Sequence, residues 1–188
     1  RELLGIPIRQ MQDLWGPELA MVFQDPMTSL NPLVRVSRQV TEHLHRHLGV
    51  NRDQARQTAL ELMREVQIPE PETRLRAFPH ELSGGMRQRV CIAIALACEP
   101  TLLFADEPTT ALDVTVQHQI LNLLGREKRD RDMTMVLVTH DLGVVAGRTD
   151  DTMVMYAGKV VEQAPTPTLF AEMRHPYSEA LLRSIPRI

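Results

Sequence analysis

The sequence lacks the features of a membrane-spanning or secreted chain. Its longest uninterrupted apolar run extends only from Val90 to Cys98, whereas a membrane-spanning helix needs about 20 apolar residues. No signal peptide is visible at the start, where the first residue is Arg1. We therefore expect a chain that does not cross a membrane.

Cysteine is scarce, and Cys91 and Cys98 are the only two in the chain. Both lie in the same helix-like apolar run, where seven residues of helix separate them by roughly 10 Å. That separation is too large for a disulfide. We therefore expect two small buried apolar side chains, and a reducing cytoplasm fits this usage.

A surplus of positive charge is also missing. The chain has 21 lysines and arginines against 24 aspartates and glutamates, which gives a formal charge of −3. Proteins that grip a phosphate backbone usually carry a basic excess, so nucleic acid is not an expected partner. The 188 residues, 43% hydrophobic and 24% charged, instead suit one globular domain or one domain with a small insert.

Apolar runs and helical periodicities alternate along the chain. The patterns predict strands over residues 20–23, 102–105 and 133–138, and helices over 35–66, 83–97 and 114–128. Prolines 69, 71 and 79 predict an extended linker, so residues 31–80 look like a helical insert. From residue 83 onward, helix and buried strand alternate. This order predicts an α/β fold with a parallel sheet that is covered by helices on both faces.

Polar residues follow each predicted strand: Gln24, the pair Asp106-Glu107, and His140. Ligands of parallel sheets bind beyond the carboxyl ends of the strands, so these side chains are expected to converge. Two adjacent carboxylates at a buried strand end are costly unless a cation or hydrogen bonds compensate them. We expect Asp106 to hold magnesium and Glu107 to face a water, the alternative being a solvated turn. A strand-end histidine taken alone is more often structural than catalytic.

Three further features each allow a functional and a structural interpretation. Ser83-Gly84-Gly85 opens a predicted helix, where backbone N–H groups can approach an anion, but a serine-capped turn explains it equally well. Asp113 alone indicates a helix N-cap. His43 and His47, one helical turn apart, could share a metal, but a solvated face is the simpler interpretation.

Five motifs follow one another in the chain: FQDP at 23–26, LSGGMRQR at 82–89, LLFADEP at 102–108, ALD at 111–113 and VTHD at 138–141. In this order they resemble the ATP-binding-cassette (ABC) family of ATPases. The resemblance extends from about residue 20 to the C-terminus. It implies a P-loop NTPase-like parallel sheet flanked by helices, with an α-helical subdomain inserted.

The resemblance implies a role for each matching residue. Gln24 corresponds to the Q-loop glutamine, Asp106 to the Walker B aspartate, Glu107 to the catalytic glutamate and His140 to the switch histidine. Ser83, Gly84 and Gly85 begin the signature motif, and Asp113 is the D-loop aspartate. ATP and Mg²⁺ are the implied cofactors. Glu107 and His140 would be catalytic, and Gln24 and Asp106 would hold the metal. The residues that would bind the cofactor are Gln24, Ser83, Gly84, Gly85, Asp106 and Asp113.

The resemblance also implies an organisation and a branch. Residues 1–30 would start the core with the Q-loop, and 31–82 would form the α-helical subdomain. Residues 83–165 would form the RecA-like core, and 166–188 a C-terminal extension. The segments FQDPMTSLNP at 23–32 and HPY at 175–177 are similar to the ATPases of dipeptide, oligopeptide and nickel importers.

That branch implies an ATPase on the cytoplasmic face of the inner membrane. It would work as a head-to-tail dimer with a second cassette, bound to two transmembrane permease subunits, and would serve an extracytoplasmic solute-binding protein indirectly. The solute would be a dipeptide or oligopeptide, with nickel or another small solute as the alternative. A soluble cassette acting on DNA or ribosomes, and a catalytically incompetent module, are the competing interpretations.

One family element is absent from the sequence. A P-loop needs Gly-x-x-x-x-Gly-Lys followed by Ser or Thr. The only Gly-Lys pair, Gly158-Lys159, is followed by Val160, and its surroundings predict a hairpin turn. In the family this element lies upstream of Gln24, so either an upstream part is missing or the gene product is a remnant. We expect the 188-residue chain by itself to bind ATP weakly and to be inactive.

Overall fold

The computed structural model describes residues 2–110 and 112–183. Ala111 of the ALD motif and residues 184–188 of the expected C-terminal extension lie outside the described residues. The chain forms two compact units, of which the first ends at Val136 and the second begins at Leu137.

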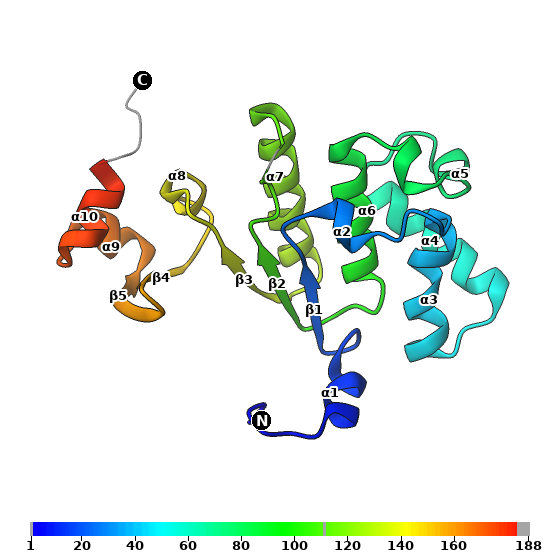
Figure 1. Ribbon diagram of the computed structural model, residues 1–188, viewed down its shortest axis with the longest axis horizontal. Helices are drawn as coiled ribbons and strands as arrows, with labels where there is room; N and C mark the ends of the chain where they lie inside the picture. The colour runs from blue at the N-terminus through cyan, green and yellow to red at the C-terminus, as the bar shows by residue number, and fades with distance from the viewer. Residues whose placement is uncertain (1, 111, 184–188) are drawn as a thin grey trace. The chain divides into compact units, whose positions relative to one another are not determined.

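A three-stranded sheet forms in the order β1 (Leu19–Val22), β2 (Leu102–Asp106) and β3 (Thr134–Val138) (Figure 1). β1 and β2 pair in parallel, with Val22 opposite Ala105. Leu103 and Ala105 of β2 are fully buried, while the alternate residues Leu102, Phe104 and Asp106 are half-buried. The α/β class predicted from alternating helices and apolar strands is therefore confirmed.

The first unit contains seven α-helices among its described residues. They are α1 (Ile8–Leu14), α2 (Pro26–Ser29), α3 (Val36–Leu48), α4 (Arg52–Glu65), α5 (Pro71–Arg74), α6 (Gly84–Leu96) and α7 (Val114–Asp130). Helix α6 is central, because it contacts α2, α3, α4, α7 and β1 (Figure 1). Its second half, residues 90–96, is apolar on every side, as expected for a helix that other elements surround.

The helical stretch predicted over residues 35–66 consists of two helices. Gly49 ends α3 in the left-handed conformation, with φ of 62°, which glycine adopts without steric cost. Asn51 then starts α4 through a capping box. The Asn51 side chain accepts a hydrogen bond from the backbone N–H of Gln54, and the Gln54 side chain accepts one from the backbone N–H of Asn51. The capping box expected from the Asn51–Gln54 spacing is confirmed.

Two expectations about the local structure are wrong. Prolines 71 and 79 start short helices, α5 and the 3₁₀ helix Pro79–Glu81, rather than an extended linker, because proline suits the first turn of a helix. Strand β3 is less buried than its apolar run predicts, with Val136 and Val138 exposed by 41% and 47%. As the last strand in the order β1-β2-β3, it has one neighbouring strand among the described residues.

The second unit is built on a hairpin. Its described elements are α8 (Leu142–Val145), β4 (Asp151–Tyr156), β5 (Lys159–Pro165), α9 (Thr166–Ala171) and α10 (Pro176–Arg183). β4 and β5 pair antiparallel, and both turn residues, Ala157 and Gly158, have positive φ. The hairpin predicted at Gly158-Lys159 is confirmed. Glu162 of β5 accepts hydrogen bonds from the backbone N–H groups of Arg174 and His175, which fastens the HPY segment to the hairpin.

Across residues 2–110 and 112–183, every helix is too short or too polar to span a bilayer.

The two cysteines lie inside α6 and just after it, and both are buried and unpaired, as expected. Burial raises the pKa of the Cys91 thiol to about 12. Because the neutral form is favoured until the pH reaches that value, only about one thiol in ten thousand is ionised at pH 8. We expect iodoacetamide to label Cys91 very slowly in the native protein and rapidly in urea. Fast labelling of Cys91 in the folded chain would contradict this burial.

Candidate active site

Gln24 and Glu107 meet where β1 and β2 end. Each lies two residues beyond the paired positions Val22 and Ala105, so the parallel register brings them level with one another. The Gln24 Nε2 group donates a hydrogen bond of 2.7 Å to Glu107 Oε2. The structure thus brings together two of the residues that the strand-end pattern singles out.

Glu107 is held in an unusual backbone conformation. Its φ is 42°, in the left-handed region that non-glycine residues rarely adopt. The backbone N–H of Thr110 donates to the Glu107 carbonyl over 3.1 Å, which closes a turn. Such strained positions persist where the surrounding structure enforces them, and they cluster at functional sites.

Thr110 is a contact that the sequence patterns did not single out. Its hydroxyl donates a hydrogen bond of 2.8 Å to Glu107 Oε2, the same oxygen that Gln24 contacts. Two neutral donors therefore fix the orientation of the half-buried carboxylate. The signal in the sequence is a threonine three residues after the glutamate, in a turn that also contains Pro108, because such hydroxyls often bond back across a turn.

Asp106 is the last residue of β2 and is half-buried. Alternation along the strand places it on the face opposite Leu103 and Ala105. Since a carboxylate only accepts hydrogen bonds, the Gln24 amide must turn its nitrogen to Glu107, and its oxygen Oε1 points elsewhere. Asp106 and Gln24 thus offer oxygen ligands of the kind that Mg²⁺ prefers.

The fit of a magnesium ion to these residues is partial. Within the described residues, no group of three or more His, Cys, Asp or Glu side chains is arranged to hold a metal. Mg²⁺ usually takes one or two protein carboxylates and completes its octahedron with phosphate oxygens and water. A site with two protein oxygens is therefore consistent with magnesium that arrives with a nucleotide.

Ser83 and the glycine pair begin α6. The Ser83 hydroxyl accepts from the backbone N–H of Met86 over 3.3 Å, so the serine-capped turn is present. A Cβ atom on Gly85 would lie 2.8 Å from Cγ1 of Val116, whereas one on Gly84 would meet only Leu112, at 3.7 Å. Gly85 is therefore needed for the close approach of α6 to the start of α7, and Ser83 and Gly84 are exposed.

Asp113 caps α7. Its Oδ1 accepts a hydrogen bond of 3.0 Å from the backbone N–H of Val116. The N-cap role that the sequence allows for this residue is therefore present. Because Val116 also packs against Gly85, the cap of α7 and the start of α6 lie close together.

His140 lies in the second unit, just after β3, and its side chain is exposed. The neighbouring residues form a structured corner. The Asp141 backbone N–H donates to the Thr139 hydroxyl over 3.1 Å, and the Asp141 carboxylate accepts from Gly143 at the start of α8. The role of His140 beside Glu107 stays a prediction.

The paired histidines of α3 do not have the solvated face expected from their spacing. The rings of His43 and His47 stack with centroids 6.0 Å apart, and His43 is half-buried. Burial is the main cause that lowers the pKa of His43, and the neighbouring His47 adds to it. The ring of His47 packs against the segment that contains Gly16.

Comparison with protein families decides the relationship. Residues 2–110, more than half of the chain, match the family described as ABC transporter. The chain belongs to the ABC transporter family. Residues 161–188 also match the family described as oligopeptide/dipeptide transporter, C-terminal region. The first three motifs, at 23–26, 82–89 and 102–108, lie within the first matched range, and the HPY segment at 175–177 lies within the second.

Curated members of the ABC transporter family resemble this chain over almost its whole length. It is 50% identical over 188 residues to the oligopeptide transport ATP-binding protein OppD of Bacillus subtilis, covering all of this chain and 52% of that protein. It is 50% identical over 186 residues to the dipeptide transport ATP-binding protein DppD of Escherichia coli, covering 99% and 57%. The chain therefore spans about half the length of the curated relatives it matches.

Solved structures of ABC cassettes share the fold. The ATP-binding cassette MJ0796, solved as a dimer bound to ADP and Pi, aligns with a TM-score of 0.75 at 29% identity, over 86% of this chain and 68% of that one. CbiO1 from Clostridium perfringens, part of the ABC transporter complex cbiONQ, aligns with a TM-score of 0.74 at 28% identity, over 94% and 70%. The P-loop NTPase-like fold expected from the motifs is confirmed.

Proposed function

We propose that this chain forms the hydrolytic part of an ATPase subunit that energises the import of dipeptides or oligopeptides. The observation that carries the proposal is the contact of Gln24 with Glu107 beside Asp106, at the carboxyl ends of two parallel strands. The names of relatives that are about half identical to this chain support peptides as the solute.

In this proposal Glu107 polarises the water that attacks the γ-phosphate. Phosphoryl transfer to water depends mainly on positioning and on stabilisation of charge. Gln24 and Thr110 hold the carboxylate in place through two short hydrogen bonds to one oxygen. Asp106 and the Gln24 oxygen would hold magnesium, which neutralises charge on the phosphates when it is bound. His140 would contact the γ-phosphate.

The start of α6 serves a second cassette in the proposal. Its Ser83 cap is exposed, and the backbone N–H groups at the N-terminus of this 13-residue helix favour an anion. In a head-to-tail dimer these groups would face the ATP bound to the partner's P-loop, with Asp113 at the same interface. The closed dimer would bind ATP better than ADP, and this difference in affinity would drive the transport cycle.

Further subunits would complete the transporter. Two transmembrane permease subunits would hold the ATPase pair at the cytoplasmic face of the inner membrane, and a solute-binding protein would deliver the peptide from outside. Within the chain, residues 31–82 would form the α-helical subdomain between the core segments 1–30 and 83–165. Residues 166–188 would form the C-terminal extension.

Purification of the full-length gene product from membranes tests the proposal. We expect it to co-purify with permease subunits, and we expect its ATPase rate in the reconstituted complex to rise when a peptide-loaded binding protein is added. Stimulation by nickel but not by peptides would move the assignment to the alternative solute. Co-purification with ribosomes or DNA, without permeases, would contradict an importer role.

A further inference from the structure

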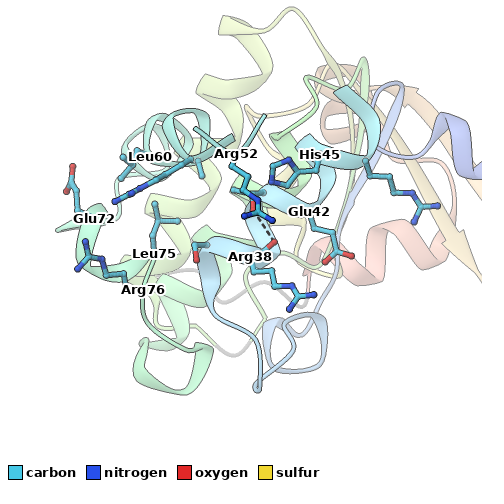
Figure 2. A pocket seen from close by; sticks show the side chains of 13 residues that line it. Arg38, Glu42, His45, Arg52, Leu60, Glu72, Leu75 and Arg76 are labelled. Atoms are coloured by element: carbon cyan, nitrogen blue, oxygen red, sulfur yellow. Dashed lines mark hydrogen bonds between the residues drawn. The ribbon is translucent and has the colours of Figure 1, made fainter. Parts of the chain in front are cut away.

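A basic hollow lies in the helical segment between α3 and α4, and it shares no residue with the candidate active site. Its volume is about 960 Å³, and side chains from α3, α4 and residues 72–76 line it. Figure 2 shows Arg38, Glu42, His45 and Arg52 at one end of the hollow and Leu60, Glu72, Leu75 and Arg76 at the other.

The lining is strongly cationic, although the chain as a whole carries a formal charge of −3. Five arginines face two glutamates, which gives the lining a formal charge of +3; the arginines are Arg38, Arg46, Arg52, Arg56 and Arg76. All five are exposed, and no carboxylate among the described residues forms an ion pair with any of them. One of the two glutamates, Glu72, is already bound by Arg64, which lies outside the lining.

The floor of the hollow is apolar. Ala59 and Leu75 are buried, and Leu60 is half-buried. Arg52 is also the first residue of the 14-residue helix α4, where the positive end of the helix dipole adds to its own charge.

The spacing of the arginines favours a ligand with more than one anionic group. Arg38 and Arg46 are eight residues apart on α3, and Arg52 and Arg56 are one turn apart on α4, so the cations border the hollow from both helices. Guanidinium groups present pairs of N–H donors that match the oxygens of a phosphate group. A concave site suits a discrete molecule, whereas a membrane surface is flat.

We propose that this hollow binds a small molecule that carries two or more phosphate groups. The inference does not depend on the proposed function, because it uses no residue of the hydrolytic site. The phosphates lie among the guanidinium groups of α3 and α4.

Calorimetric titration of the 188-residue chain with inorganic triphosphate tests the inference. We expect saturable binding with a dissociation constant below about 0.1 mM. Arg38→Gln and Arg52→Gln should each weaken it about tenfold, since each removes a charged donor. Arg129→Gln is the matched control, because Arg129 is an exposed arginine of α7 outside the hollow, and it should bind like the unchanged chain. These arginines are exposed, so unfolding midpoints should stay the same.

Four results would overturn the inference. The first is the absence of saturable binding, and the second is equal weakening in Arg52→Gln and Arg129→Gln. The third is loss of binding in Ser83→Ala but not in the arginine variants, which would place the triphosphate at the start of α6. The fourth is arginine-dependent binding to phosphatidylglycerol vesicles without any binding of triphosphate, which would make the hollow a membrane contact. The third result would leave the proposed function standing, so the two proposals fail separately.

Discussion

Glu107→Gln in the full-length gene product is expected to lower kcat for ATP hydrolysis by about 10²–10⁴-fold and to leave ATP binding intact. Glutamine keeps the shape of the side chain, and its amide oxygen can still accept hydrogen bonds from Gln24 and Thr110. What it loses is the negative charge that polarises the attacking water. The measurement is the steady-state ATPase rate, together with nucleotide binding by calorimetry.

Glu61→Gln is the matched control for this variant. Glu61 is an exposed glutamate of α4 whose side chain accepts a hydrogen bond from the Gln57 side chain of the same helix. It should hydrolyse ATP at the unchanged rate. Hydrolysis by Glu107→Gln at the rate of this control would remove Glu107 from its proposed role.

Alanine substitutions at the two adjacent glycines of α6 should change the free energy of unfolding in opposite directions. A Cβ atom at position 85 would lie 2.8 Å from a methyl group of Val116, and a β-branched valine has little freedom to turn away. We expect Gly85→Ala to lower the free energy of unfolding by about 1–3 kcal/mol. At position 84 the nearest atom is 3.7 Å away, so Gly84→Ala should cost nothing and stabilise by up to about 1 kcal/mol.

Urea denaturation of the two variants measures this difference directly. Each serves as the control for the other, because both make the same chemical change at the start of the same helix. The double variant Gly85→Ala with Val116→Ala should recover part of the loss, since the smaller side chain removes the clash. Equal stability of the two single variants would show that α6 and α7 do not approach as closely as described.

Much of the fold could be predicted from the sequence because the signals are local. The apolar runs before Gln24 and Glu107 are short and uninterrupted, and each ends at polar residues. This pattern is typical of a buried parallel strand that carries site residues at its carboxyl end. The pairing of Gln24 with Glu107 then follows from two strands of similar length that start in register. The Asn51 capping box is equally local, since both of its hydrogen bonds join residues three apart.

The remaining features depend on contacts between distant segments. Nothing in the run before Glu107 indicates its left-handed backbone, which the turn to Thr110 imposes. The partial exposure of β3 depends on its place at one end of the strand order, and an apolar run carries no information about neighbours. The basic hollow could not be predicted either, because it forms only when α3 packs against α4 and Arg38 and Arg52 come to line the same space.

A crystal structure of the Glu107→Gln full-length gene product with ATP and Mg²⁺ would show which residues surround the γ-phosphate and the metal. We expect a water between residue 107 and the γ-phosphate, Asp106 and the Gln24 oxygen at the metal, and the His140 side chain at the γ-phosphate. Position 107 turned away from the γ-phosphate, or a metal held by other residues, would contradict this expectation.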